Sequence, residues 1–222
     1  AVSIASQAQI SWAKTDAFDR AKILHKAANL LREANDELAH LEVRDVGKVF
    51  SEAVSADVPS GTDAFDYFAA CITTQNGDFN KWDKAIGYSV RVPLGVCAGI
   101  GAWNYPMQIA CWKSAPALAA GNAFILKPSE ETPLVAHKVA ELLQAAGLPD
   151  GLFQIIHGDR DIGAALCAHP GIAKISLTGG VETGRLIMAQ SAQSLKKITL
   201  ELGGKSPLLV FEDCDFDLAV QT

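Results

Sequence analysis

The chain has 222 residues, of which 49% are hydrophobic and 20% are charged, a composition typical of a globular protein. The net charge of -6 and the lack of a basic cluster argue against a nucleic-acid partner. No run of about 18 uncharged apolar residues occurs, and the first thirty residues lack the order of a signal peptide. We therefore expect no membrane partner and a cytoplasmic location.

The cysteines and histidines do not form a recognisable metal or disulfide pattern. The five cysteines are widely spaced without a CxxC pair, which favours reduced, structural thiols. The sequence also lacks an HExxH motif and any histidine pair four residues apart. We therefore predict no metal site.

Residues 1–72 have the apolar periodicity of helices. The spacing predicts helices over 18–31, 35–45 and 49–70, the last bent or divided at Pro59 and Gly61. Residues 73–92 are expected to form a polar connection followed by a strand over 88–92, in which Tyr88, Val90 and Val92 share one face.

From residue 93 onward, short apolar runs alternate with helical patterns. This alternation predicts an α/β fold, a Rossmann-like doubly wound parallel sheet with helices on both faces, preceded by the N-terminal helices. Thr132 and Pro133 suit the cap and first position of one of these helices. The expected strands are 96–100, 123–127, 153–157, 173–177, 198–202 and 208–211, and the helices 106–120, 133–146, 161–168 and 182–193.

Ligands of such sheets bind at the carboxyl ends of the strands, so the strand-to-helix junctions are the candidate sites. In "TGGVETGR", Gly179 and Gly184 follow a strand and can pass a phosphate close to backbone N–H groups. Arg185 stands where a P-loop requires lysine, so the segment is not a P-loop. A simple turn is the alternative reading.

Two further junctions carry polar side chains. Lys127 and Glu130 in "KPSE" can hydrogen-bond ribose hydroxyls, or they can form a solvated surface pair. Asn104 in "AWNYP" can donate to a developing oxyanion, or it can be an ordinary turn asparagine.

Glu201 lies between two leucines at the end of a predicted buried strand, in "LELGGKSP". Burial would raise the pKa of its carboxyl group towards neutrality, which suits a general base. A structural salt bridge with Lys205 is the alternative.

Together, the ordered motifs "GAWNYP", "WKSAPALAAGN", "LKPSEETP", "TGGVETG" and "LELGGKSP" resemble the aldehyde dehydrogenase superfamily. The resemblance runs from about Trp12 to Val220 and covers the N-terminal helices and most of the NAD-binding domain. Within the family, "PLGVCAGIGAWNYP" resembles the betaine-aldehyde and 4-trimethylaminobutyraldehyde dehydrogenases. The resemblance implies NAD as cofactor, a small-molecule aldehyde as substrate, and a dimer or tetramer.

The resemblance also implies roles for individual residues. Asn104 matches the oxyanion-hole donor, Glu201 the general base that activates water, and Lys113 a lysine assisting that base. The implied substrate residues are Tyr105 and Trp112, which lie seven residues apart on one predicted helix face. The implied cofactor-binding residues are Trp103, Lys127, Glu130, Gly179, Gly184 and Leu202.

Two departures from the family pattern bear on activity. Gly180 stands where serine is usual, which removes one hydroxyl donor to phosphate. The nucleophilic cysteine is expected near a position 235, beyond these residues, and Cys214 is too close to Glu201 to match it. We therefore predict the N-terminal part of an NAD-dependent aldehyde dehydrogenase: an incomplete NAD-binding domain with a helical part (1–72), a connection (73–92) and Rossmann-like units (93–222). The alternative is a short, non-catalytic paralogue that binds nucleotide or acts structurally.

Overall fold

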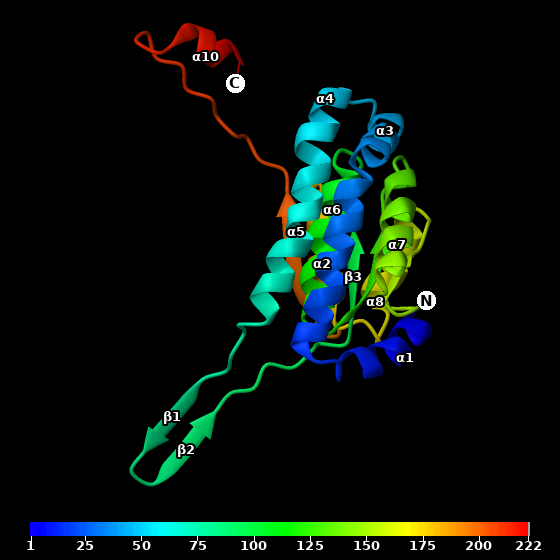
Figure 1. The fold of residues 1–222 in the computed structure, drawn as a ribbon, viewed down its shortest axis with the longest axis vertical. Helices are drawn as coiled ribbons and strands as arrows, with labels where there is room; N and C mark the ends of the chain where they lie inside the picture. The colour runs from blue at the N-terminus through cyan, green and yellow to red at the C-terminus, as the bar shows by residue number, and fades with distance from the viewer. Residues whose placement is uncertain (222) are drawn as a thin grey trace.

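The computed structural model describes residues 1–221 and begins with a helical layer (Figure 1). Asp16 caps α2, where its carboxylate accepts a hydrogen bond from the Phe18 N–H at 2.8 Å, and Gly47 ends α3 in the left-handed conformation. The first helix was not predicted. The layer comprises α1 (Val2–Trp12), α2 (Ala17–Glu33), α3 (Asn35–Val46), α4 (Phe50–Glu52), a π-helix (Ala53–Asp57) and α5 (Val58–Ile72).

The third helical segment is interrupted by the π-helix rather than at Pro59 or Gly61, so the predicted position of the division was wrong; both residues lie inside α5. Pro59 lies in the first turn of α5, two residues after the end of the π-helix. Gly61 is buried against α6, and a methyl group added there would lie 3.1 Å from Cε of Met107. The glycine therefore lets α5 approach α6 closely.

Five parallel strands form the central sheet in the order β5-β4-β3-β6-β7. Short runs rich in apolar residues form its central strands, and every residue of β3 and β4 is buried. The chain leaves the middle strand β3 for β4 and β5 on one side, then crosses to β6 and β7 on the other, so the doubly wound prediction is confirmed. The strands are β3 (Val96–Ile100), β4 (Ala123–Lys127), β5 (Phe153–Ile155), β6 (Lys174–Gly179) and β7 (Lys197–Leu202).

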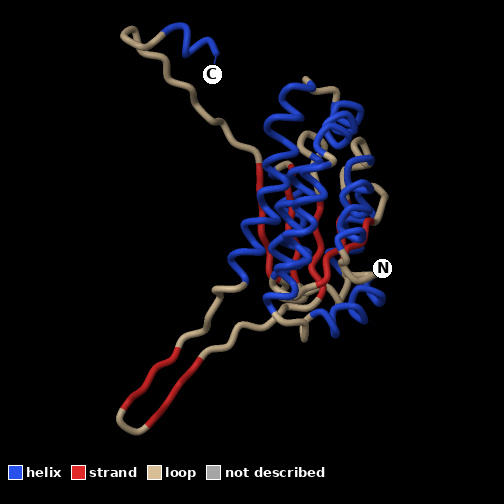
Figure 2. Tube along the Cα trace, viewed as in Figure 1, coloured by secondary structure: helices blue, strands red, loops and turns tan. Residues whose placement is uncertain are grey.

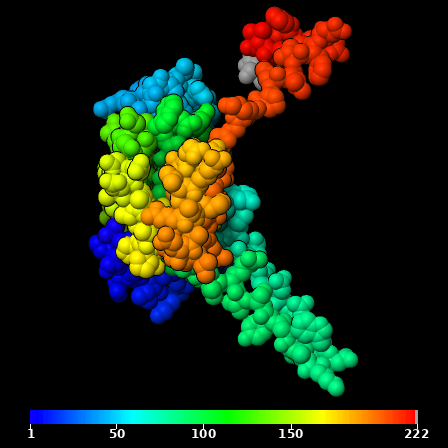
Figure 3. Space-filling model, turned by 180° about the vertical axis from the view of Figure 1, so that it is seen from behind, coloured from blue at the N-terminus to red at the C-terminus, as the bar shows by residue number. Residues whose placement is uncertain are grey.

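Helices cover both faces of this sheet (Figures 2 and 3). On one face lies α6 (Pro106–Ala119), backed by the N-terminal helices and α7 (Leu134–Ala146). Gly99 of β3 faces this side, because a methyl group added there would meet Lys113 of α6. The next residue, Ile100, points the other way and lies near Gly163 of α8 (Arg160–Ala168). There α8 packs beside α9 (Val181–Ala192), seen in yellow and orange in Figure 3.

The start of α7 differs from the prediction. Thr132 does not cap this helix, whose N-cap is Pro133 with no side-chain cap hydrogen bond. The carboxylate of Asp45, at the end of α3, instead accepts a hydrogen bond from the Val135 N–H at 3.0 Å. A distant acidic side chain thus satisfies a free N–H of the first turn.

A two-stranded hairpin projects from the body, where a polar connection was expected (Figures 1 and 3). It pairs β1 (Phe79–Trp82) with β2 (Ala85–Tyr88). The predicted strand over 88–92 was therefore wrong beyond its first residue. Tyr88, Val90 and Val92 are all exposed, as are Phe79 and Trp82.

The chain beyond β7 leaves the body in an extended segment and ends with α10 (Phe216–Gln221) (Figure 1). The strand predicted over 208–211 is absent, because no strand among residues 1–221 pairs with this apolar run. Within the same residues, no helix is both long and apolar enough to cross a membrane.

Candidate functional site

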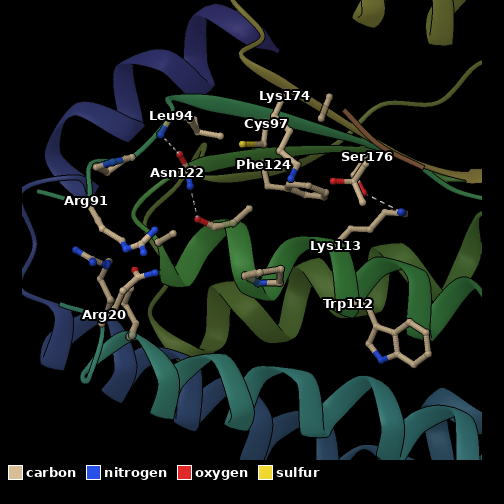
Figure 4. A pocket seen from close by; sticks show the side chains of 18 of the residues that line it. Arg20, Arg91, Leu94, Cys97, Trp112, Lys113, Asn122, Phe124, Lys174 and Ser176 are labelled. Atoms are coloured by element: carbon tan, nitrogen blue, oxygen red, sulfur yellow. Dashed lines mark hydrogen bonds between the residues drawn. The ribbon is translucent and has the colours of Figure 1, made fainter. Parts of the chain in front are cut away.

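Two clefts lie against the central sheet. The first, of about 1410 Å³, lies on the α6 side of β6 and β7 (Figure 4). Strands β3 and β4 contribute Cys97, Ala98 and Phe124 to its wall, whereas the part formed by β6 and β7 is polar because alternate residues of these strands face the cleft. These residues are Lys174, Ser176, Thr178, Thr199 and Glu201.

Lys113 of α6 reaches into the first cleft. Its ammonium donates a hydrogen bond to the Ser176 hydroxyl at 3.0 Å, and the residue is only 8% exposed. The absent side chain of Gly99 leaves room for it, since a methyl group there would lie 3.3 Å from Cδ of Lys113. Burial lowers the pKa of Lys113 to about 8, with Lys174 adding to the effect and the Glu201 charge opposing it.

Glu201 lies in β7 and pairs in register with Thr178 of β6. The prediction that it is buried was wrong. The residue is exposed because β7 is the edge strand of the sheet within residues 1–221. No ion pair joins Glu201 to Lys205 in the described chain, so the alternative salt bridge is also absent. Its electrostatic interaction is with Lys113.

The second cleft, of about 1220 Å³, lies at the carboxyl ends of the strands between the β3–α6 loop, α8 and α9. It occupies the switch point between β3 and β6, where ligands bind in sheets of this topology. Five of the six residues predicted to bind a cofactor line it, namely Trp103, Lys127, Glu130, Gly179 and Leu202.

Lys127 and Glu130 form an ion pair at this cleft, with 3.0 Å between Nζ and Oε2. The lysine side chain is 5% exposed and the glutamate side chain 53% exposed, so the pair is not the fully solvated alternative. A hydrogen bond from its own backbone N–H, together with Lys127, lowers the pKa of the Glu130 carboxyl group. Glu130 therefore presents an ionised acceptor at the cleft.

Gly184, the sixth predicted cofactor residue, does not line the cleft. It is buried in the first turns of α9, and a methyl group there would lie 2.9 Å from Cδ2 of Leu202. Its small size lets Leu202 rest against the helix. A methyl group at Gly180, the N-cap, would meet no atom within 4 Å, so the space before the helix N-terminus is open.

The two clefts meet at Asn104, Thr178 and Glu201, each of which lines both. Asn104 follows β3 in the β3–α6 loop and is half-buried. An amide donor and a carboxylate thus stand where a ligand in one cleft could contact a ligand in the other.

Tyr105 and Trp112 both line the first cleft. They were predicted to share a helix face, but only Trp112 is helical. Tyr105 is the N-cap of α6, with φ −140° and ψ 59°. The indole N–H of Trp112 donates to the Ser60 carbonyl at 3.1 Å, which ties the ring to α5 (Figure 4).

Sequence reasoning missed Ser176 and Thr178 as site residues. The signal was present, because Lys174, Ser176 and Thr178 alternate with the buried Ile175 and Leu177 in a strand read only as apolar. Polar residues at every second position of a strand whose other residues are buried indicate that one face of the strand lines a cleft.

Cys97 lines the first cleft, whereas Cys71, Cys111, Cys167 and Cys214 line neither cleft. Burial raises the pKa of Cys97 to about 11 and also raises those of Cys111 and Cys167, so these thiols stay protonated near neutral pH. Cys214 lies in the turn before α10, outside both clefts. Among the described residues, no cluster of potential metal ligands occurs.

Comparison with known proteins identifies the family. The model of the aldehyde dehydrogenase family matches residues 1–222. The chain belongs to the aldehyde dehydrogenase family. It is 55% identical over 221 residues to a betaine aldehyde dehydrogenase of Rhizobium etli, covering 99% of this chain and 45% of that protein. A betaine aldehyde dehydrogenase of Agrobacterium fabrum is 54% identical over the same coverage.

Solved structures agree in fold. An aldehyde dehydrogenase of Bacillus cereus in complex with NAD+ superposes with a TM-score of 0.95 at 37% identity, covering 99% of this chain and 46% of that one. An NADP-dependent enzyme of E. coli gives the same TM-score, identity and coverage. The family resemblance inferred from the motifs is confirmed. The chain spans about half the length of the relatives that it matches.

Proposed function

We propose that the protein oxidises an aldehyde to a carboxylic acid with NAD as hydride acceptor. A cysteine outside these 222 residues would form the thioester that water then hydrolyses. The observation that carries the proposal is the meeting of the two clefts at Asn104 and Glu201. Hydride transfer requires the aldehyde carbon and the cofactor to touch, and these side chains stand where the two clefts join.

The second cleft suits a dinucleotide. Glycines line it where a phosphate would approach backbone, and the N-terminus of the twelve-residue α9 opens onto it beside the unobstructed Gly180. Lys127 and Glu130 are placed to hydrogen-bond ribose hydroxyls. When bound, NAD would supply the hydride acceptor. Because Glu130 is ionised and exposed, a 2′-phosphate beside it would be repelled, which favours NAD over NADP.

The first cleft suits the aldehyde. Asn104 would donate to the oxygen of the tetrahedral intermediate as negative charge develops there. Glu201 would accept a proton from the water that attacks the thioester. Lys113, whose pKa of about 8 lies near neutrality, would exchange that proton with Glu201 and stabilise its charge.

We infer that the substrate carries a trimethylammonium group, as in betaine aldehyde or 4-trimethylaminobutyraldehyde. Such a group neither donates nor accepts hydrogen bonds, so aromatic faces are its natural partners. Tyr105 and Trp112 line the first cleft, and the named relatives are betaine aldehyde dehydrogenases. The exposed apolar side chains of the hairpin support a dimer or tetramer. The cytoplasmic location stays a prediction.

Product analysis of the whole protein tests this proposal. With NAD and betaine aldehyde, NADH and the carboxylic acid should form in equal amounts, and a neutral aldehyde of equal length should react with a lower kcat/KM. A folded whole protein that binds NAD but oxidises no aldehyde would support the non-catalytic alternative instead. Equal kcat/KM values for the two aldehydes would contradict the substrate assignment alone.

A further inference from the structure

A buried ionic cluster lies directly behind Tyr105. Lys48, in the loop after α3, forms an ion pair with Asp57 at the end of the π-helix. The Lys48 ammonium also lies 3.7 Å from Oε1 of Glu42 and 3.9 Å from the centroid of the Tyr105 ring. We define Glu42, Lys48 and Asp57 as the Lys48 cluster.

The cluster is held in place from several elements. The Lys48 side chain is 11% exposed, that of Asp57 is 2% exposed, and that of Glu42 is fully buried. Glu42 Oε2 accepts a hydrogen bond from the Met107 N–H at 3.1 Å, which fixes the carboxylate to the first turn of α6. Glu42, on α3, and Asp57 therefore determine where the Lys48 ammonium lies relative to Tyr105 at the start of α6.

Stability alone does not account for such a cluster. Desolvating the Lys48–Asp57 ion pair offsets most of its attraction, and apolar side chains of similar volume often serve a core equally well. Burial also raises the pKa of Glu42 to about 7. Oε1 of Glu42 also lacks a hydrogen-bond partner in the described chain, which adds to the cost. The π-helix that ends at Asp57 is a rare conformation, found mostly near functional sites.

The polar contact that the described chain gives the Tyr105 side chain is the one with Lys48. Tyr105 precedes α6 and lies outside its regular backbone, and its hydroxyl makes no hydrogen bond within residues 1–221. The Lys48 ammonium over one ring face is its specific polar contact, and a cation in that place attracts the ring by roughly 0.5–2 kcal/mol. The Tyr105 residue is 37% exposed and lines the first cleft, so it remains accessible there.

We propose that Lys48 is a positioning residue that fixes the Tyr105 ring, so that the face opposite the lysine meets the cationic end of the substrate. This inference rests on the proposed function of the first cleft. Asp57 neutralises the Lys48 ammonium, so a second cation on the other ring face meets a nearly neutral pair rather than a bare charge. The Lys48 cluster thereby orients the ring without repelling a trimethylammonium group.

Binding of tetramethylammonium to the whole protein, measured by calorimetry, tests the inference without any catalytic step. Lys48→Met should weaken binding by about 2–30-fold, the range that loss of an oriented ring contact spans. Lys48→Arg keeps a cation that can stack on the ring, so the affinity of this variant should stay within about twofold of wild type. The exposed Lys26→Met is the matched control and should leave binding unchanged.

A double-substitution cycle distinguishes positioning from a general effect. In a Tyr105→Leu background, Lys48→Met should change affinity by less than about twofold, because its effect passes through the ring. If the Lys48→Met variant does not fold, the double variant Lys48→Met/Asp57→Asn, which lacks both charges of the ion pair, is used in its place. With active protein, Lys48→Met should raise KM for the cationic aldehyde and leave its kcat and the constants for a neutral aldehyde unchanged.

Three results would overturn the inference: no binding of tetramethylammonium to wild type, unchanged affinity in Lys48→Met, or an undiminished Lys48→Met effect without Tyr105. Failure of the proposed function would look different. The protein would then oxidise no aldehyde while the binding pattern across these variants persisted.

Discussion

Replacing Lys113 with methionine should stabilise the protein at neutral pH, because this lysine is buried for function rather than for stability. The drop in its pKa from 10.5 to about 8 means that burying the charged ammonium lowers the free energy of unfolding by about 3 kcal/mol. The hydrogen bond to Ser176 stabilises the folded protein by about 1 kcal/mol and offsets part of this cost. Lys113→Met should therefore raise the free energy of unfolding by about 2 kcal/mol at pH 7.

The sign of the pH dependence follows from the two protonation states. Below pH 8 the lysine is charged in both the folded and the unfolded protein, so the full penalty applies. Between pH 8 and 10.5 the folded protein has lost the proton while the unfolded chain retains it, and the penalty disappears. The advantage of Lys113→Met should thus fall to near zero at about pH 10.

Urea unfolding of the whole protein at both pH values measures this difference, with the exposed Lys26→Met as control. A Lys113→Met variant that is less stable than wild type at pH 7 would refute the reasoning. So would a gain that is equal at both pH values, since it would reflect better packing rather than removal of a buried charge.

Three further predictions concern the cofactor cleft and the hairpin. Glu130→Gln should lower the preference for NAD over NADP in kcat/KM by at least about tenfold, because it removes the repulsion of the 2′-phosphate; an unchanged ratio contradicts this. Gly184→Ala should push the neighbouring leucine into the cleft and raise the Kd of NAD by roughly three- to tenfold, or about 1 kcal/mol. Gly204→Ala is its control and should change Kd by less than about twofold, since Gly204 lines neither cleft and the added methyl group meets no atom within 4 Å. Trp82→Glu places a charge on the exposed hairpin and should reduce the mass measured by light scattering, whereas an unchanged oligomer would place the subunit contact elsewhere.

Much of the sheet was predictable because its strands are specified locally. The run at 96–100 and the run at 123–127 are short, apolar and followed by helical patterns, which together indicate buried parallel strands. Gly47, Gly121 and Gly147 adopt positive φ at helix ends, where their lack of a side chain makes this conformation inexpensive. Such features depend on a few neighbouring residues and can be read from them.

The errors arose where distant parts of the chain decide the outcome. The exposure of Glu201 depends on which strand lies beside β7, and its two flanking leucines do not reveal that. In the first turn of α7, the Val135 N–H donates to the carboxylate of Asp45, some ninety residues away, rather than to Thr132. The contact between Lys48 and Tyr105 likewise joins two segments that no local pattern relates.

The most direct test of the central claim is transient kinetics of Glu201→Gln in the whole protein. If Glu201 activates the water that hydrolyses the thioester, NADH should appear in a rapid burst, with slow turnover afterwards and unchanged NAD binding. Mass spectrometry should detect the acyl group on the protein during the slow phase. Normal steady-state turnover without a burst, together with a lower melting temperature, would show that Glu201 is structural and contradict the account.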